Sequence, residues 1–351
     1  MLLQRLSGIV KRVGKVISLP GCREHFYDLS KLRPKQRAPR SPIMQIYSAA
    51  PNIGNYLPVL GIQRMLGTQP DVWHISDPGI DFEFINRHYR CCIIGGAGLV
   101  HKCFEPFWKA FFDRCKLPTI VWGVGGCFPD LGTKPRVQFP DSMVDAGIAG
   151  KVFGRCDLVN VRDDVTANRY ELKDASIAAC PTIIHLRDYV RNPWRKTGYV
   201  LFSSHEELLQ EGETEEIKEV LAREVGLYRY TKNHEAPLNG LSRILDQFAD
   251  SRLVVTTRLH GAIIAYGLGV PYVCIARDEK VRAFNRLYGG GVNVEDISTL
   301  PDAIGAAEKP AAGSIAYDAV LAFGERAREW AAAHTQGCAV PDSAIAGLET
   351  P

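Results

Sequence analysis

The chain has 351 residues, of which 46% are hydrophobic and 23% are charged, ordinary values that exclude a disordered or fibrous protein. This length exceeds what one compact core usually holds, so two domains of about 150 residues each are expected. The net charge is +3, which is too small to indicate a nucleic-acid partner, and the longest apolar runs have only the length of strands. We therefore expect neither nucleic-acid binding nor a membrane-spanning helix.

The ten cysteines include no C-x2-C pair, so they predict neither a disulfide scaffold nor a zinc site. Several lie in apolar runs such as residues 91–94, where a free thiol behaves as a small buried hydrophobe. Reduced thiols and the lack of a cleavable signal pattern favour the cytoplasm.

The amino-terminal segment is strongly basic. Residues 1–43 carry ten Lys or Arg against two acidic residues, a net charge of +8 that leaves −5 on the rest of the chain. Within residues 2–17 apolar side chains recur at helical spacing with basic ones between them, which favours a helix lying on an anionic membrane surface through residues 1–20. A terminal helix packed on the fold, or a loose tail, fits the same pattern. Residues 31–42 contain three prolines and five basic residues and predict an extended linker, so we treat residues 1–42 as one basic segment and linker.

From residue 43 onward, short apolar runs alternate with amphipathic helical stretches, which predicts parallel sheets covered on both faces. In a first domain, 43–190, strands are expected at 43–48, 72–75, 90–94, 119–122, 158–161 and 177–179, and helices at 56–66, 104–115, 144–155 and 164–172. In a second domain, 191–310, strands are expected at 199–203, 227–230, 253–256 and 272–276, and helices at 213–225, 238–249, 261–268 and 279–288. An Ala-rich helix at about 314–334 and a tail complete residues 311–351. The predicted fold class is α/β, with two Rossmann-like domains facing a cleft.

In such sheets ligands bind beyond the carboxyl ends of the strands, where this chain places glycines and polar side chains. Glycines there let backbone N–H groups approach an anion at a helix N-terminus, although turn formation alone also explains glycine after a strand. The candidate ligand-facing residues chosen by this rule are Asn52, Gly54, Asn55, Gly95, Gly96, Gly98, Gly125, Arg162, Asp163, His205, Arg258, Leu259 and His260. The dinucleotide fingerprint, the G-x-S-x-G elbow and the Walker A sequence are all missing from the chain, which disfavours nicotinamide enzymes, common serine hydrolases and P-loop NTPases.

The ordered set of these motifs resembles the polysaccharide pyruvyl transferase family over about residues 44–290. The motifs are Asn52-x-Gly54, Gly95-Gly96-Ala97-Gly98, Trp122-Gly123-x-Gly125, Val161-Arg162-Asp163, Cys180-Pro181-Thr182, Thr257-Arg258-Leu259-His260-Gly261-Ala262, Gly269-Val270-Pro271 and Asp278-x-Lys280-x-x-x-Phe284. The resemblance implies two Rossmann-like domains of the GT-B type, phosphoenolpyruvate as donor substrate without a further cofactor, and a saccharide acceptor that receives a pyruvate ketal and can be lipid-linked. The family usually has Asp where Asn55 stands, and Asn can accept a hydrogen bond but cannot take a proton.

The chemistry of such a donor explains the residue types. A phosphate and a carboxylate together bring nearly three negative charges, and the planar fork of Arg162 and Arg258 suits both groups, with Lys280 as a third cation. Because these cations would neutralise the donor, no metal is expected. Ketal formation also needs proton transfer, for which His260 titrates in the right range. Arg258 and His260 can share one face only in extended backbone, so we expect residues 257–260 to be non-helical.

Simpler roles fit several of these residues. Arg162 beside two acids can form a surface ion pair, and Asp278 with Lys280 can form another. His260, flanked by apolar residues, can be a buried core histidine. His205 can be a helix-start residue, and His101 can face an acceptor sugar.

The sequence therefore predicts a cytoplasmic pyruvyl transferase, with His260 as general acid or base and Arg162 and Arg258 holding the donor. A nucleotide-sugar glycosyltransferase of the GT-B type is the alternative enzyme. A glycan-binding or membrane-recruited scaffold without catalysis is the alternative of another class.

Overall fold

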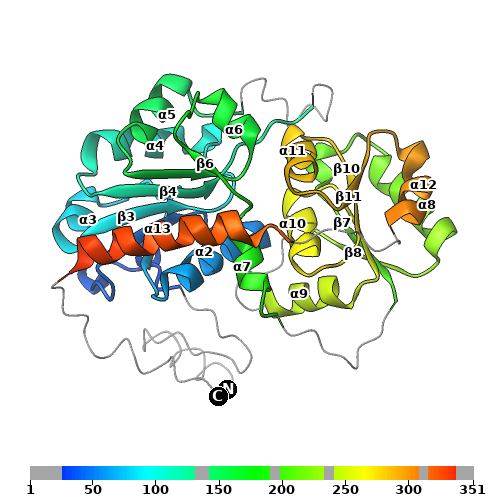
Figure 1. Ribbon diagram of the computed structural model, residues 1–351, viewed down its shortest axis with the longest axis horizontal. Coiled ribbons are helices and arrows are strands. Elements are labelled where there is room, and N and C mark those ends of the chain that lie inside the picture. The colour runs from blue at the N-terminus through cyan, green and yellow to red at the C-terminus, as the bar shows by residue number, and fades with distance from the viewer. Residues whose placement is uncertain (1–25, 131–141, 190–197, 233–240, 308–314, 337–351) are drawn as a thin grey trace, which may run out of the picture.

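The computed structural model describes residues 26–130, 142–189, 198–232, 241–307 and 315–336. Two parallel sheets, each covered by helices on both faces, lie side by side (Figure 1), which confirms the predicted fold class. In the part of the chain that is described, no helix is both long and apolar enough to cross a bilayer.

The first sheet has six strands in the order β2-β1-β3-β4-β5-β6. The strands are β1 (Ile43–Tyr47), β2 (Asp71–His74), β3 (Cys91–Gly95), β4 (Thr119–Val124), β5 (Leu158–Val161) and β6 (Ser176–Ile177). The helices are α2 (Ile53–Leu66), α3 (Phe82–His88), α4 (Glu105–Arg114), α5 (Ala146–Phe153), α6 (Asp164–Arg169) and α7 (Thr182–Leu186). The central strands β1, β3 and β4 are buried along their whole length, which their mostly apolar sequences favour, although Gln45 and Thr119 are buried polar residues within them.

The second sheet has five strands in the order β11-β10-β9-β7-β8. The strands are β7 (Val200–Ser203), β8 (Tyr228–Thr231), β9 (Leu253–Thr256), β10 (Tyr272–Ile275) and β11 (Gly291–Val294). The helices are α8 (Glu213–Val225), α9 (Leu241–Asp250), α10 (Leu259–Gly267), α11 (Glu279–Tyr288) and α12 (Leu300–Ala307). All strand pairs of both sheets are parallel.

One apolar core runs through both domains. It joins residues of α2 and α7 to residues of α9 and α10, for example Leu57 and Ile183 to Ile244 and Ile263. The last helix, α13 (Tyr317–Thr335), returns from the second domain and lies along the first (Figure 1). There the ring of Phe323 meets the edge of Trp122 at 5.2 Å between centroids.

The Pro-rich residues 31–42, expected as an extended linker, contact the first domain and include a short helix. Residues 26–42 are fixed to the first sheet by η1 (Leu29–Lys31), η2 (Pro34–Gln36) and their neighbours. Leu29 is fully buried, and the Asp28 carboxylate accepts the Tyr47 hydroxyl at 2.6 Å. The guanidinium of Arg37 covers the Trp73 ring. The Pro-rich run therefore has specific partners on the domain, and the predicted amphipathic helix of residues 2–17 lies outside the described residues.

Candidate active site

Arg162 enters the space between the domains at the carboxyl end of β5. Its side chain is buried, with Nη2 donating to the Gly126 carbonyl at 3.3 Å, while Nε and Nη1 make no hydrogen bond with the described residues. The neighbouring Asp163 caps α6 by accepting the Thr166 N–H at 2.7 Å, and its other oxygen lies 3.6 Å from Arg162 Nε. A surface ion pair is thus excluded, since guanidinium and carboxylate are both buried.

Gly125 leaves the room that this arginine needs. A Cβ on Gly125 would lie 2.3 Å from Arg162 Nε and 2.9 Å from the free oxygen of Asp163. Gly98, on the loop after β3, has the same guanidinium 3.8 Å from its own Cβ position. Both predicted glycines therefore border Arg162, which is why larger residues cannot replace Gly125 without moving the charge.

Lys280 comes from the opposite domain, in the first turn of α11. Its ammonium is 2.6 Å from Asp278 and 3.3 Å from the sulfur of Cys127. Asp278 is 1% exposed, so this pair is buried and is not a surface pair. Burial alone would lower the pKa of Lys280, but the adjacent Asp278 carboxylate outweighs it and raises that pKa, so the lysine is charged.

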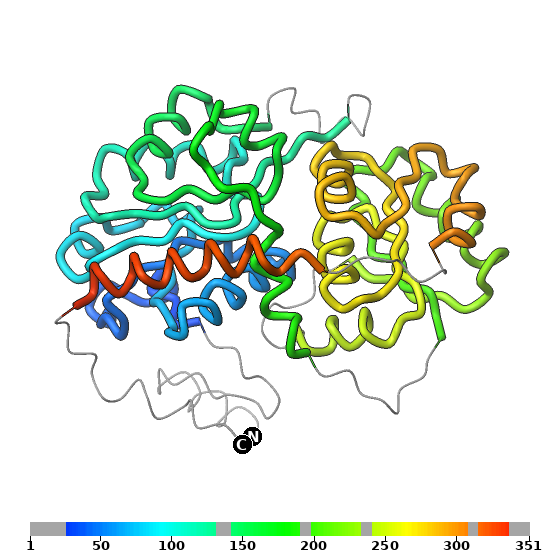
Figure 2. The backbone as a smooth tube through the Cα atoms, in the orientation of Figure 1, coloured from blue at the N-terminus to red at the C-terminus, as the bar shows by residue number. Residues whose placement is uncertain are grey.

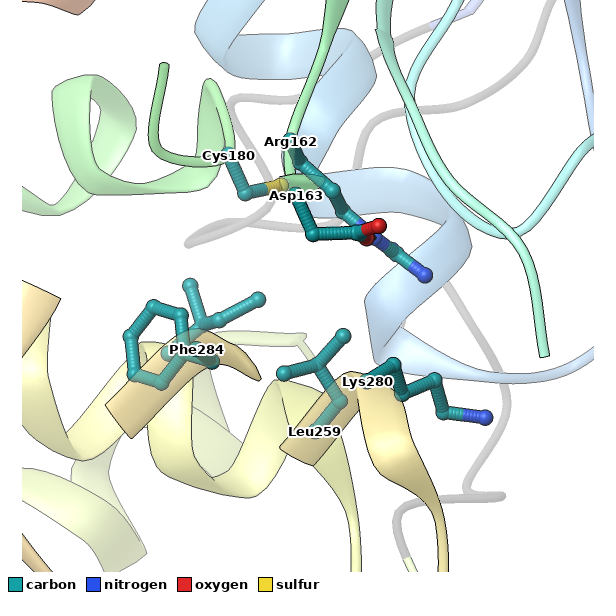
Figure 3. Close-up of a pocket in the computed structure, with 7 residues that line it drawn as sticks. Arg162, Asp163, Cys180, Leu259, Lys280 and Phe284 are labelled. Atoms are coloured by element: carbon teal, nitrogen blue, oxygen red, sulfur yellow. The ribbon is translucent and has the colours of Figure 1, made fainter. Parts of the chain in front are cut away.

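A small, partly open space lies between the two domains at these cations. Figure 3 shows Arg162 and Lys280 reaching it from opposite domains, with both charged ends directed to the same side. The space is too narrow to hold a free water molecule. The lining residues are Arg162, Asp163, Cys180, Leu259, Ile263, Lys280 and Phe284. The structure thus brings together four predicted site residues, Arg162, Asp163, Leu259 and Lys280.

His260 lies beside this space, against Gly54 at the start of α2 and with Nε2 3.9 Å from the Cys180 sulfur. The expectation of a non-helical backbone over 257–260 is wrong in part. Arg258 is extended, with φ −106° and ψ 133°, but α10 begins at Leu259, so His260 belongs to its first turn. Just before this helix start, the Thr256 hydroxyl accepts the Arg258 N–H at 2.9 Å.

The electrostatic surroundings of His260 keep it neutral. Burial lowers the pKa of His260 well below its ordinary value, and the positive charges of Arg162, Lys280 and Arg258 lower it further. The imidazole is therefore neutral but a weak base while these three cations are unopposed. An anion bound among the same cations would oppose their effect.

Arg258 stands at the end of β9, as predicted, but does not line the space between the domains. Its buried Nε donates to the Ser204 carbonyl, and burial lowers its pKa to about 10 despite the acidic Glu207 and Glu206. His205 is nearby, with its N–H donating to Thr257 and its ring 3.5 Å from Glu207. These residues form a second polar group at the carboxyl edge of the second sheet.

The remaining predicted residues have local structural partners. Asn52 caps α2 by accepting the Gly54 N–H at 2.9 Å, and the Asn55 amide donates to the Ala50 carbonyl at 3.0 Å. A Cβ on Gly95 would meet Ile62 of α2, and one on Gly96 would meet Pro58 of the same helix. Close helix packing therefore accounts for these two glycines.

Sequence reasoning missed Cys180, Ile263 and Phe284, which line the space between the domains. Cys180 carried a signal, because it opens the Cys180-Pro181-Thr182 motif, but its apolar surroundings indicated a core thiol. His101 caps the short helix η3 (Lys102–Phe104), and the positive charge of Lys280 is among the causes that lower its pKa, after burial. The alternative of an acceptor-facing His101 stays a prediction.

The comparisons with known proteins agree with this architecture. One structural match is a protein from Listeria monocytogenes assigned as a UDP-N-acetylglucosamine 2-epimerase, with 13% identity and a TM-score of 0.52, covering 85% of this chain and 98% of that one. The UDP-GlcNAc 2-epimerase of Methanocaldococcus jannaschii, solved with UDP-GlcNAc and UDP, has 9% identity and a TM-score of 0.52, covering 82% and 98%. At such identities the likeness concerns the fold alone.

No match was found among curated proteins. The family model described as polysaccharide pyruvyl transferase, however, matches residues 52–279, the stretch that contains Arg162, Arg258 and His260. The chain therefore belongs to the polysaccharide pyruvyl transferase family.

Proposed function

We propose that the protein transfers the pyruvyl group of phosphoenolpyruvate to a saccharide, forming a cyclic pyruvate ketal and inorganic phosphate. The observation that carries this proposal is Arg162, a buried guanidinium whose Nε and Nη1 make no hydrogen bond with the described residues. Buried N–H groups of a cation that lack a hydrogen bond are costly, and a bound anion that accepts from them offsets that cost. Lys280 stands across the same space with a second fixed charge.

The donor fits this charge pattern because it carries a phosphate and a carboxylate. Arg162 can bind either group through two parallel N–H bonds, and Lys280 supplies a point charge. The narrow space must widen to admit the donor, so binding requires the domains to separate and close again.

The reaction requires two proton transfers that nearby residues can serve. One acceptor hydroxyl adds its oxygen to the central carbon of the donor and gives up its proton, while a proton goes to the methylene carbon and makes it a methyl group. A second hydroxyl then displaces the phosphate from the same carbon, and its proton leaves with the inorganic phosphate. Donor binding raises the pKa of His260 by countering the adjacent cations, so we infer that His260 gains the proton delivered to the methylene.

The acceptor is expected to be a sugar with two neighbouring hydroxyls, free or linked to a lipid. The binding of the donor is tested by thermal unfolding with phosphoenolpyruvate, with UDP as the comparison because the structural neighbour from M. jannaschii was solved with UDP. A ligand at about 100 times its Kd adds about 2.7 kcal/mol to native stability. Stabilisation by phosphoenolpyruvate but not by UDP is expected.

The reaction itself is tested by mass spectrometry of saccharides after incubation with phosphoenolpyruvate. The expected result is one added ketal for each phosphate released. Stabilisation by UDP alone would favour a nucleotide-sugar enzyme instead, and stabilisation by neither compound would contradict the proposal.

A further inference from the structure

Asp278 is held by both domains at once. It is 1% exposed and precedes α11. One carboxylate oxygen accepts two backbone N–H groups, that of Lys280 in its own helix and that of Phe128 in the first domain, each at 3.0 Å. The other oxygen lies 2.6 Å from the Lys280 ammonium. One side chain therefore caps a helix, crosses the domain boundary and holds the lysine.

The crossing is part of a short antiparallel contact. Pro129 pairs with Asp278, the Glu279 N–H donates to the Phe128 carbonyl at 2.9 Å, and the Asp130 N–H donates to the Arg277 carbonyl at 3.1 Å. Figure 2 shows the chain after β4 leaving the first domain to reach α11. The contact forms only when the domains are close together.

Two ion pairs flank this contact. Both terminal nitrogens of Arg282 bind Asp130, at 2.8 and 2.6 Å, and Arg286 binds Asp164 at 2.8 and 3.0 Å. Such pairs at the surface contribute little each and weaken with salt. The buried bond to Asp278 is therefore the more specific link.

The position of Lys280 depends on this arrangement. Its ammonium meets Cys127 of the first domain only because α11 is held against the loop that carries Phe128. Within the described part of the chain, Lys280 interacts electrostatically with five other titratable or charged groups, which are Asp278, Cys127, Arg162, His101 and His260. Among them only Asp278 is a carboxylate.

We propose that Asp278 is a positioning residue that couples closure of the two domains to the delivery of a charged Lys280 to the anion site. The identity of the anion rests on the proposed function, whereas the Asp278–Lys280 relationship does not. In an open form Asp278 would still cap α11 but would lose its hydrogen bond to the Phe128 N–H. Lys280 would move away from Cys127 and Arg162. In the closed form the same carboxylate keeps the buried lysine protonated.

Two substitutions separate these roles. Asp278→Asn keeps an oxygen for both backbone N–H groups, since Asn caps helices as well as Asp, but removes the negative charge. Asp278→Ser keeps a helix cap but is too short to reach Phe128 as well. Asp81→Asn, at the cap of α3 in the first domain, is the matched control for an Asp-to-Asn change at a helix start.

The first measurement is the Kd of phosphoenolpyruvate and of inorganic phosphate by calorimetry at pH 7 and pH 9. In Asp278→Asn, Lys280 loses its counter-charge, so its pKa falls and affinity should drop about tenfold more between pH 7 and pH 9 than in the wild type, the loss of one charged hydrogen bond. Asp81→Asn should follow the wild type. Equal pH dependence in Asp278→Asn and the wild type would overturn the proposal.

A second measurement needs no donor. The acylation of Lys280 by acetic anhydride, followed by peptide mass spectrometry across pH, should titrate at lower pH in Asp278→Asn than in the wild type. An unchanged titration overturns the role of Asp278. If the titration of Lys280 shifts in Asp278→Asn but the wild type does not bind phosphoenolpyruvate, only the proposed donor is rejected.

A third measurement tests closure. The radius of gyration in solution scattering should be larger for Asp278→Ser than for Asp278→Asn, which should match the wild type. Equal values for Asp278→Ser and the wild type would show that the bond to Phe128 does not hold the domains together.

Discussion

The imidazole of His260, in the second domain, occupies the space beside Gly54 of the first domain, where a Cβ would lie 2.2 Å from Nδ1. No larger residue fits at position 54 unless the histidine moves. The glycine of the predicted Asn52-x-Gly54 motif is thus required by His260 of the other domain. The spacing of the motif alone cannot show this contact.

Gly54→Ala should therefore displace His260. We expect turnover to fall by about 10 to 100-fold, as small misplacements of a reacting group cause, and phosphoenolpyruvate affinity to change little. Gly150→Ala in α5 is the control, because its Cβ meets nothing within 4 Å, and it should gain about 0.5–1 kcal/mol of stability with unchanged turnover. Single-turnover rates and thermal unfolding of both variants measure this. Normal turnover in Gly54→Ala would contradict the placement of His260.

Replacing His260 by Gln should lower turnover by about 10² to 10⁴-fold, the usual loss for a general acid or base, while the donor still binds. If His260 were only a packing residue, the melting temperature and the rate would fall together. Thermal unfolding and single-turnover kinetics on the same preparation decide between the two. A folded variant with a normal rate would refute the proposed mechanism.

His260 also predicts how stability depends on pH. Its pKa in the folded protein is far below the ordinary value. Below about pH 6.5 the histidine is therefore protonated in the unfolded chain but still neutral in the folded protein. His260 therefore destabilises the fold as the pH falls from 7 to 5, by up to about 1.4 kcal/mol per pH unit. His260→Gln should lose less stability than the wild type over this range in urea unfolding. His88→Gln, at an exposed position, should follow the wild type.

The two arginines should respond differently to replacement by Lys. Arg162→Lys removes the guanidinium fork that would bind the donor, so phosphoenolpyruvate affinity should weaken at least about tenfold. Because only Nη2 of Arg162 makes a hydrogen bond in the protein without ligand, the melting temperature should change little. Arg258→Lys gives up the buried bond to the Ser204 carbonyl and should cost about 1–3 kcal/mol of stability. Donor titration and thermal unfolding compare them. A larger loss of stability in Arg162→Lys would contradict this division.

Two amino-terminal deletions should separate membrane affinity from folding. Removal of residues 1–25 should leave the melting temperature unchanged and abolish binding to vesicles with anionic lipid, because that segment holds the basic amphipathic pattern. Removal of residues 1–41 should also destabilise the protein, by about 1.5–3 kcal/mol for each of the buried Phe26 and Leu29 side chains. Vesicle sedimentation and thermal unfolding test both. Continued vesicle binding after the shorter deletion would refute the membrane role.

The strands and most helices could be predicted because buried parallel strands are short, almost entirely apolar runs. The sequence predicts α8 and α11 with their observed bounds, 213–225 and 279–288. It did not predict α3, α7, α12 or β11, since α3 has only seven residues, α7 has only five and β11 begins at a glycine. Such elements are fixed by tertiary contacts more than by local preference.

The site was predictable only where a polar residue followed a buried strand. That rule found Arg162. It could not show that the Arg258 side chain binds the Ser204 carbonyl and does not line the space between the domains, because every residue has a main-chain carbonyl and the sequence does not indicate which one will accept a hydrogen bond. It also could not pair Lys280 with Cys127, which lies 153 residues away. The partners of long side chains are decided by how the domains meet.

The return of α13 to the first domain has a consequence for synthesis. Trp122 is buried partly by Phe323, Gly324 packs on Met65, and the Trp330 indole donates to Asp157 at 2.9 Å, so the last helix completes the surface of a domain begun nearly three hundred residues earlier. On the ribosome the first sheet cannot acquire this covering until the whole second domain has been translated. A nascent chain stopped before residue 315 should therefore keep an apolar face open, and chaperones that bind such faces should stay with it until release.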